Sequence, residues 1–280
     1  MDRTSRYDIR LQGLTVGYGS KAVVTDVNAT LPGGKITVIL GGSGSGKSTL
    51  LKHILRLHRP LAGSVTIGGH DMFGLSRKAL RCLKQRLGLL FQDGALLGSL
   101  TLFDNIALPL REHTRLKEKA VAEIVRAKAG LVGLADFLDY FPNQLSGGMR
   151  KRAGLARAMV MDPEILFCDE PTSGLDPVNS AALDDLLLEL KRRFDMTLVV
   201  VSHDLASMRR IADHVVVLGR GKVLFDGTQA ELEATQDPYL RRFLERRAEE
   251  GAGEMLSMPK LDPKVMKIDC SKYLGAGNGR

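Results

Sequence analysis

A glycine-rich loop between a short apolar strand and a helix constrains this chain more than any other feature. Residues 36–40 form an apolar run bounded by glycines, as expected of a buried parallel strand, and residues 47–57 have a helical pattern. The loop between them fits the phosphate-binding pattern G-x-x-x-x-G-K-[ST]. Chance would produce this pattern in roughly one chain in a hundred of this length. Because a strand precedes the loop and a helix follows it, the alternative that this is only a flexible loop is weak.

The chemistry of this loop predicts binding of nucleotide phosphates. Glycines let backbone N–H groups close around the phosphates, and the helix N-terminus adds partial positive charge. Lys47 is expected to reach the β- and γ-phosphates, and the Ser48 hydroxyl to ligate Mg²⁺. The predicted ATP-binding set here is Gly41, Gly42, Ser43, Gly44, Ser45, Gly46, Lys47, Ser48 and Thr49.

A second apolar strand, residues 165–168, ends in two carboxylates, Asp169 and Glu170. Ligands of open α/β folds bind at the carboxyl edge of the sheet, where these residues are expected. Phosphoryl transfer needs a metal ion and an oriented attacking water. We therefore predict that Asp169 holds Mg²⁺ and that Glu170 takes a proton from the water or orients it. Taken without the glycine-rich loop, the two acids could equally be residues that end a strand before a proline turn and have no catalytic role.

The segment Leu145-Ser146-Gly147-Gly148-Met149, called the signature segment below, separates this chain from other phosphate-binding-loop proteins. Ser146 can cap the helix that follows, while Gly147 and Gly148 allow a γ-phosphate to approach bare N–H groups. The segment closely resembles the signature sequence of the ABC ATPase family, in which Gln is more common at the position of Met149. This resemblance implies that the segment faces the phosphate-binding loop of a partner subunit, with ATP between two chains.

Four further positions resemble family motifs in the right order along the chain. Gln92 resembles the glutamine that touches Mg²⁺ or the attacking water and relays nucleotide state to the membrane subunit. His203 resembles the histidine that hydrogen-bonds the γ-phosphate, and Asp176 the aspartate at the dimer interface. Tyr18 resembles the aromatic residue that stacks on adenine. Each is weak alone, because a lone histidine or glutamine is commonplace; together they favour an ABC-type ATP hydrolase.

The fold class expected is the α/β ABC-ATPase fold, with a mostly parallel sheet, an N-terminal antiparallel β part, a helical subdomain and a C-terminal extension. Strand patterns at residues 9–16, 23–31, 65–67, 87–91, 197–201 and 215–218 alternate with helical ones at 180–193 and 205–211. A nearly all-helical stretch predicts the helical subdomain at about 93–161. We expect an ATPase domain over residues 1–245 and an extension, docked on a partner or disordered, over 246–280.

Composition restricts partner and compartment. The net charge of +8 is scattered, and with no Trp there are few aromatics to stack bases, so nucleic acid is not an expected partner. Three widely spaced cysteines, Cys82, Cys168 and Cys270, favour neither a disulfide framework nor a zinc site and fit a reducing compartment. Neither a membrane span nor a signal peptide is expected from the apolar pattern.

Residues around Gln92 indicate the subfamily. Residues 90–97, 103–105 and 109–114 resemble the ATPase of Mla/Mce-type bacterial phospholipid transporters, whereas residues 171–176 follow the general ABC pattern. The resemblance implies a peripheral subunit on the cytoplasmic face of the bacterial inner membrane. Its implied partners are a second ATPase subunit, integral membrane permease subunits, a lipid-binding Mce-like protein and a small accessory subunit.

Three alternatives to this interpretation stay open at the level of sequence. The transporter could carry another solute. A non-transport ABC protein of ribosomes or DNA usually has two cassettes or a long coiled-coil insertion, and this sequence shows neither feature. A P-loop kinase or GTPase would leave His203 and the signature segment unexplained.

Overall fold

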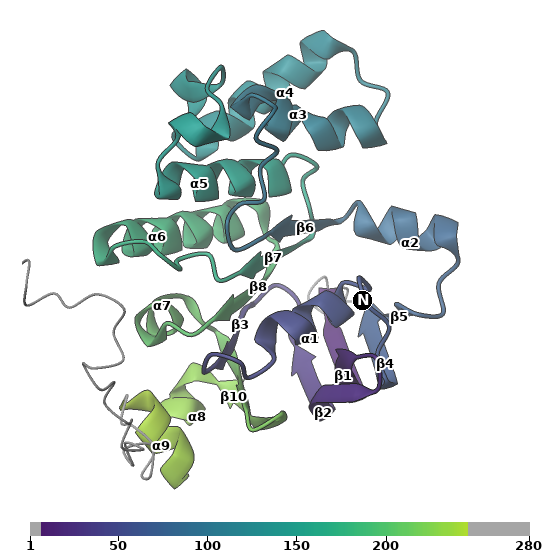
Figure 1. Cartoon of the computed structure of the whole chain (residues 1–280), viewed down its shortest axis with the longest axis vertical. Helices are drawn as coiled ribbons and strands as arrows, with labels where there is room; N and C mark the ends of the chain where they lie inside the picture. The colour runs from purple at the N-terminus through teal and green to yellow at the C-terminus, as the bar shows by residue number, and fades with distance from the viewer. Residues whose placement is uncertain (1–6, 246–280) are drawn as a thin grey trace, which may run out of the picture.

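The computed structural model describes residues 7–245 and is built around a six-stranded sheet of order β10-β9-β3-β8-β7-β6 (Figure 1). Five of its strands are parallel, and β10 pairs antiparallel with β9. The strands are β3 (Ile36–Gly41), β6 (Leu87–Leu90), β7 (Ile165–Asp169), β8 (Thr197–Ser202), β9 (His214–Gly219) and β10 (Lys222–Thr228).

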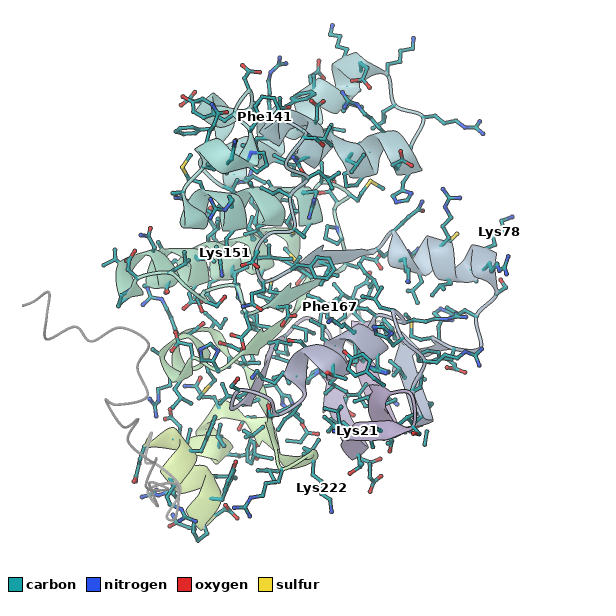
Figure 2. The ribbon with its side chains drawn as sticks, viewed as in Figure 1. Lys21, Lys78, Phe141, Lys151, Phe167 and Lys222 are labelled. Carbon is teal, nitrogen blue, oxygen red and sulfur yellow. The ribbon has the colours of Figure 1, made fainter. Side chains whose placement is uncertain are left out.

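Both faces of this sheet are covered, which explains the continuous apolar runs of its central strands. In β3, Val38 and Leu40 enter the core on one face, while Ile39 enters the core on the other. In β7, Cys168 enters the same core as Val38, and Phe167 enters the same core as Ile39. Phe167 lies near the centre of the molecule (Figure 2). Because successive side chains of a strand point to opposite faces, only a strand buried on both sides reads as uniformly apolar.

The core that contains Ile39 and Phe167 lies on one face of the main sheet. It joins that face to an antiparallel sheet of order β2-β1-β4-β5 and to helix α1 (Lys47–Ile54). Strands β1 and β2 form a long pair with register shifts near Leu14 and Val16. The strands are β1 (Ile9–Tyr18), β2 (Lys21–Leu31), β4 (Ala62–Ile67) and β5 (His70–Asp71).

Helices cover the opposite face and extend beyond it. Residues of α5 (Gly147–Ala158), α6 (Pro177–Phe194) and α7 (Leu205–Ile211) contribute to the core on this side. Next to them, α3 (Leu102–His113) and α4 (Glu118–Leu131) form the end of the molecule farthest from the antiparallel sheet (Figure 1). The remaining helices are α2 (Arg77–Lys84), α8 (Gln229–Glu233), α9 (Pro238–Leu244) and two 3₁₀ turns, Ala135–Phe137 and Pro142–Gln144.

The predicted fold class is confirmed, with four strands or α-helices missed besides the two 3₁₀ turns, and with some ends displaced. Helix α1 ends at Ile54 rather than at residue 57, since Arg56 adopts a left-handed φ of 52°. Helix α6 begins at Pro177 rather than at residue 180, because Asp176 caps it and proline suits its first turn. The elements missed are β5, α2, α8 and α9.

A tight hairpin joins β9 and β10. Lys222 pairs with Gly219, so the connection has two residues, Arg220 and Gly221, both with positive φ. Positive φ at both positions is typical of the type I′ turn that suits tight hairpins. The domain limits 1–245 and 93–161 stay predictions, and the expected extension over 246–280 lies outside the described residues, as does Cys270.

Candidate active site

Four parallel strands bring the predicted site residues to one edge of the main sheet. Strand β3 runs into the phosphate-binding loop, β7 into Glu170, β8 into His203, and β6 leads within two residues to Gln92. Because the carboxyl ends of parallel strands meet at one edge, residues distant in sequence become neighbours in space.

The phosphate-binding loop can be built only with glycine at two points. Gly46, which precedes α1, has a left-handed φ of 95°, and a Cβ there would lie 2.3 Å from Cγ2 of Val24. A Cβ on Gly41 would lie 2.5 Å from the backbone oxygen of Leu218. Both positions leave no room for a side chain. The first turn of α1 has no acidic residue and no capping side chain, so its N–H groups can meet an anion.

Lys47 is held within this loop. Its Nζ donates hydrogen bonds to the carbonyl oxygens of Gly41 (2.8 Å) and Gly42 (3.0 Å) and lies 3.7 Å from Oε1 of Glu170. The lysine is buried, with 7% of its surface exposed. A buried ammonium beside bare helix N–H groups makes the loop strongly attractive to phosphate.

Ser48 and Asp169 meet although they are far apart in sequence. The Ser48 hydroxyl donates a hydrogen bond of 2.9 Å to Oδ1 of Asp169. Burial raises the pKa of Asp169, as does the negative charge of Glu170, and the Ser48 hydrogen bond opposes this rise. A hydroxyl and a carboxylate that favours a positive neighbour are the hard oxygen donors that suit Mg²⁺.

Glu170 stands at the centre of the site with an unusual backbone. Its φ is 50°, a conformation uncommon for residues other than glycine, and its N–H donates to the backbone oxygen of Val201 (2.9 Å). Nδ1 of His203 lies 2.7 Å from Oε2 of Glu170. Strained conformations of this kind gather at functional sites. The carboxylate is therefore fixed between Lys47 and His203, as a group that must orient a water would be.

The signature segment lies on the opposite face of the sheet from α1. Ser146 caps α5 as predicted, because its Oγ accepts the N–H of Met149 at 3.2 Å. A Cβ on Gly147 would meet nothing within 4 Å, so its backbone is open to a ligand. Asp176 caps α6 by accepting the N–H groups of Val178 and Asn179, each at 3.0 Å.

The structure therefore brings Lys47, Ser48, Asp169, Glu170 and His203 together with the backbone of the phosphate-binding loop. Gln92 is exposed beyond β6. The ring of Tyr18 is half exposed and lies edge-on to His58, with ring centroids 5.4 Å apart. Thr49 carries the backbone oxygen that pairs with Nδ1 of His53, 2.8 Å away.

Two basic residues of α5 escaped the sequence analysis. The buried Nζ of Lys151 donates to the backbone oxygen of Glu170 (3.1 Å) and to Oγ of Ser173 (3.0 Å). Arg157 donates to the backbone oxygens of Gly94 (2.8 Å) and Ala95 (2.9 Å), which follow shortly after Gln92 in the chain. Both lie on a helix whose small, apolar residues pack into the core, and no sequence motif marks either of them.

The fold and the site together define an α/β nucleotide-binding ATPase. Comparison with known proteins supplies the family: residues 24–173, more than half of the chain, match the family described as ABC transporter. The chain belongs to the ABC transporter family, and it is an ATP-binding subunit that hydrolyses ATP. In residues 7–245, no helix is long and apolar enough to span a membrane.

Relatives of known description agree with this assignment. The chain is 45% identical over 239 residues to the "probable ribonucleotide transport ATP-binding protein mkl" of Mycobacterium tuberculosis, covering 85% of this chain and 67% of the relative. It is 40% identical over 227 residues to the "intermembrane phospholipid transport system ATP-binding protein MlaF" of Escherichia coli, covering 81% and 84%.

Solved structures agree as well. The cbiO1 protein from Clostridium perfringens, part of the ABC transporter complex cbiONQ, has a TM-score of 0.74 and 27% identity, over 85% of this chain and 95% of that one. The ATP-binding cassette MJ0796, a dimer bound to ADP and Pi, has a TM-score of 0.72 and 30% identity, over 79% and 98%.

Proposed function

We propose that this ATPase powers transport of phospholipid or related hydrophobic cargo, as a peripheral subunit on the cytoplasmic face of a bacterial inner membrane. The observation that carries the proposal is the 40% identity to a phospholipid-transport ATPase over 81% of the chain. The resemblance of residues 90–97 to Mla/Mce-type ATPases supports it at the segment next to the groove described below.

In the proposed mechanism, two copies of the chain bind ATP between them. The phosphate-binding loop and Lys47 of one copy hold the phosphates, Tyr18 stacks on adenine, and the signature segment of the other copy supplies N–H groups from the start of α5. Support comes from the open backbone at Gly147 and the capped helix behind it. The dimeric ATP-binding cassette MJ0796 offers a precedent for such a pair.

Glu170 is proposed to orient the attacking water and to accept its proton, and His203 to hydrogen-bond the γ-phosphate. Ser48 and Asp169, together with Gln92, would hold Mg²⁺, which neutralises charge on the phosphate oxygens. The contact between Ser48 and Asp169 supports this metal assignment. Asp176 would lie at the dimer interface, since it caps α6 beside the signature segment.

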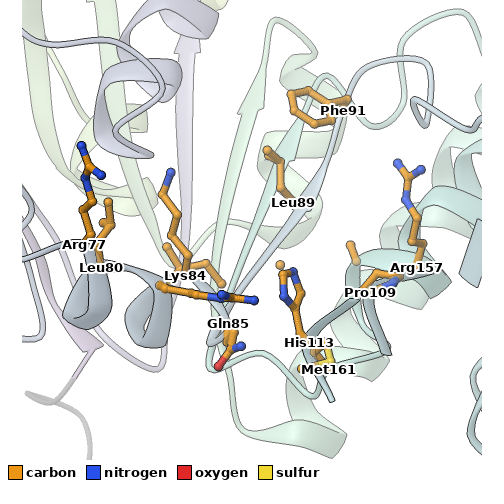
Figure 3. A pocket seen from close by; sticks show the side chains of 14 residues that line it. Arg77, Leu80, Lys84, Gln85, Leu89, Phe91, Pro109, His113, Arg157 and Met161 are labelled. Atoms are coloured by element: carbon orange, nitrogen blue, oxygen red, sulfur yellow. The ribbon is translucent and has the colours of Figure 1, made fainter. Parts of the chain in front are cut away.

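A groove between α2 and the helical layer is the proposed docking site of the permease (Figure 3). It has a volume of about 590 Å³, and Leu89 and Phe91 are among the apolar residues that line it. Its lining also carries several basic side chains, so we expect an acidic, partly apolar segment of the permease to enter it. The basic residues that line it are Arg77, Arg81, Lys84, His113 and Arg157.

One substitution pair tests this docking site. Arg81→Glu is expected to weaken association with the permease, because it places an acid in the lining of the groove that an acidic segment must enter. Lys78→Glu, an equal charge change on the exposed side of the same helix, is expected to leave association unchanged. Equal effects of the two variants in a co-purification from native membranes would argue against the groove.

Transport of a nucleotide is the second candidate cargo, because the 45% identical relative carries the description of a ribonucleotide transporter. A pull-down of the tagged chain from detergent-solubilised native membranes, with mass spectrometry of proteins and lipids, separates the two. A multi-pass permease with an Mce-like protein, a small accessory subunit and bound phospholipid is the expected result. A permease with a different binding protein and no lipid would overturn the cargo proposal and leave the ATPase assignment intact.

A further inference from the structure

The loop between β6 and α3 begins with a tight turn that contains Gln92. The N–H of Gly94 donates to the backbone oxygen of Phe91 (2.8 Å), so Gln92 and Asp93 occupy the middle of a four-residue turn. Strand β6 ends only one residue before this turn, at Leu90, and pairs with β7, the strand that ends in Asp169. One side of the turn is therefore fixed to the sheet that carries the catalytic carboxylates.

The other side of the turn is fixed to α5. Gly94 has a φ of 74°, and a Cβ on it would lie 2.7 Å from the backbone oxygen of Arg150. A Cβ on Gly154 would in turn lie 2.8 Å from Cα of Gly94. The loop and the helix thus touch backbone to backbone, which only glycines allow. Such close packing leaves the turn little freedom to slide along α5.

Arg157 completes this attachment with a two-pronged hydrogen bond. Its Nη2 donates to the backbone oxygen of Gly94 (2.8 Å) and its Nη1 to that of Ala95 (2.9 Å). The planar guanidinium can hold two successive carbonyls at a fixed spacing, which a lysine ammonium cannot match. The side chain comes from the last turn of α5, whose first turn is the signature segment.

Farther along, buried Asn105 fixes the rest of the loop to α3. Its Oδ1 accepts the N–H of Leu97 (2.8 Å), and its Nδ2 donates to the backbone oxygens of Leu97, Leu100 and Thr101 at 3.1, 3.1 and 2.9 Å. From Gly94 onward, the loop is therefore a part of the helical layer. Residues 91–93 are the chain segment that connects β6 to this fixed part of the loop.

We propose that Arg157 is a positioning residue that sets how far Gln92 reaches toward the nucleotide, and this inference rests on the proposed role of Gln92. The guanidinium holds the far end of the turn, so its loss frees Gln92 while the phosphate-binding loop stays intact. Because Arg157 also lines the groove of Figure 3, a segment bound there contacts the side chain that holds the turn. Groove and nucleotide site are thereby connected through one arginine.

A double-mutant cycle on the full-length chain tests the proposal. Arg157→Gln is expected to lower kcat by between about 10- and 100-fold, the range for small misplacements of a catalytic group, while KM for ATP stays within about twofold. In a Gln92→Ala background, the same substitution should have no further effect, since the group it positions is gone. Arg157→Lys should restore part of kcat. Arg126→Gln, on the exposed face of α4, is the matched control and should leave kcat unchanged.

Hydrogen exchange provides a readout independent of turnover. Amides of residues 92–95 should exchange about tenfold faster in Arg157→Gln, whereas those of β3 and β7 should be unchanged. If the Gln variant fails to fold, Arg157→Lys should show the same change. An Arg157 effect that persists in full without Gln92 would overturn the proposal, as would unchanged kcat in Arg157→Gln. If Gln92→Ala itself leaves kcat unchanged, the proposed role of Gln92 fails together with the inference about Arg157. If Gln92→Ala lowers kcat but the Arg157 variants do not, the role of Gln92 is retained and the inference about Arg157 fails.

Discussion

Asp184 offers a quantitative test of the packing between α6 and α7. The side chain is buried, with 2% of its surface exposed, and it accepts a hydrogen bond of 2.7 Å from the equally buried hydroxyl of Ser207. Burial raises the pKa of Asp184 from 3.8 to about 6, and the Ser207 hydrogen bond only partly opposes the rise. The folded protein therefore binds a proton at Asp184 more tightly than the unfolded chain does.

The sign of the effect follows from this difference. Stabilisation from the protonated carboxyl is fully present below pH 3.8 and is lost as the pH rises through about 6. A difference between about 6 and 3.8, at roughly 1.4 kcal/mol for each pKa unit, gives up to about 3 kcal/mol. Asp184→Asn removes the charge but keeps an oxygen for Ser207, so it should stabilise the protein by up to about 3 kcal/mol at pH 7.5. The gain should vanish near pH 4.

Thermal unfolding at several pH values measures this prediction. A gain of about 3 kcal/mol corresponds to a rise in Tm of roughly 6–12 °C for a domain of this size. Asp185→Asn is the matched control, because Asp185 is the exposed neighbour paired with Arg210, and loss of such a surface pair costs at most about 1 kcal/mol. An Asp184→Asn effect that is negative at pH 7.5, or independent of pH, would refute the reasoning.

Two further predictions concern lysines around Glu170. Lys47→Ala should weaken ATP binding itself, by at least about tenfold, because the ammonium lies in the phosphate-binding loop; titration with a fluorescent ATP analogue measures this, and unchanged affinity would contradict it. Lys151→Met should lower kcat by about tenfold with little change in ATP affinity, because the ammonium holds the backbone oxygen of Glu170 and the hydroxyl of Ser173. Steady-state kinetics measures that variant, and a loss confined to KM would contradict its expected role.

Sequence patterns predicted the strands of the main sheet well because burial on both faces demands continuous apolar runs, as in residues 197–201. Helix α2 was missed although Leu80 and Leu83 pack against the core, because the helix is short and none of its residues is fully buried. Helix α8 was also missed, although Thr228 and Glu231 form a capping box that its sequence displays. Local signals of this kind are short, so they are easily passed over between longer elements.

The candidate site was predictable where chemistry fixes both residue type and spacing. Lys47, Ser48, Asp169 and Glu170 could be chosen because strand ends and glycine loops mark their places. Lys151 could not be found in this way, since its proposed role depends on a tertiary contact with the backbone of Glu170. Any residue type with a long donor can make such a contact, so no motif records it.

The most direct test of the account is the ATPase activity of Glu170→Gln beside its ability to bind ATP. The amide keeps the shape of the side chain but cannot accept a proton from water. We expect kcat to fall by about 10²- to 10⁴-fold, the contribution typical of a general base, with ATP binding and nucleotide-dependent dimer closure retained. Full ATPase activity in this variant would contradict the assignment of Glu170 as the group that activates water.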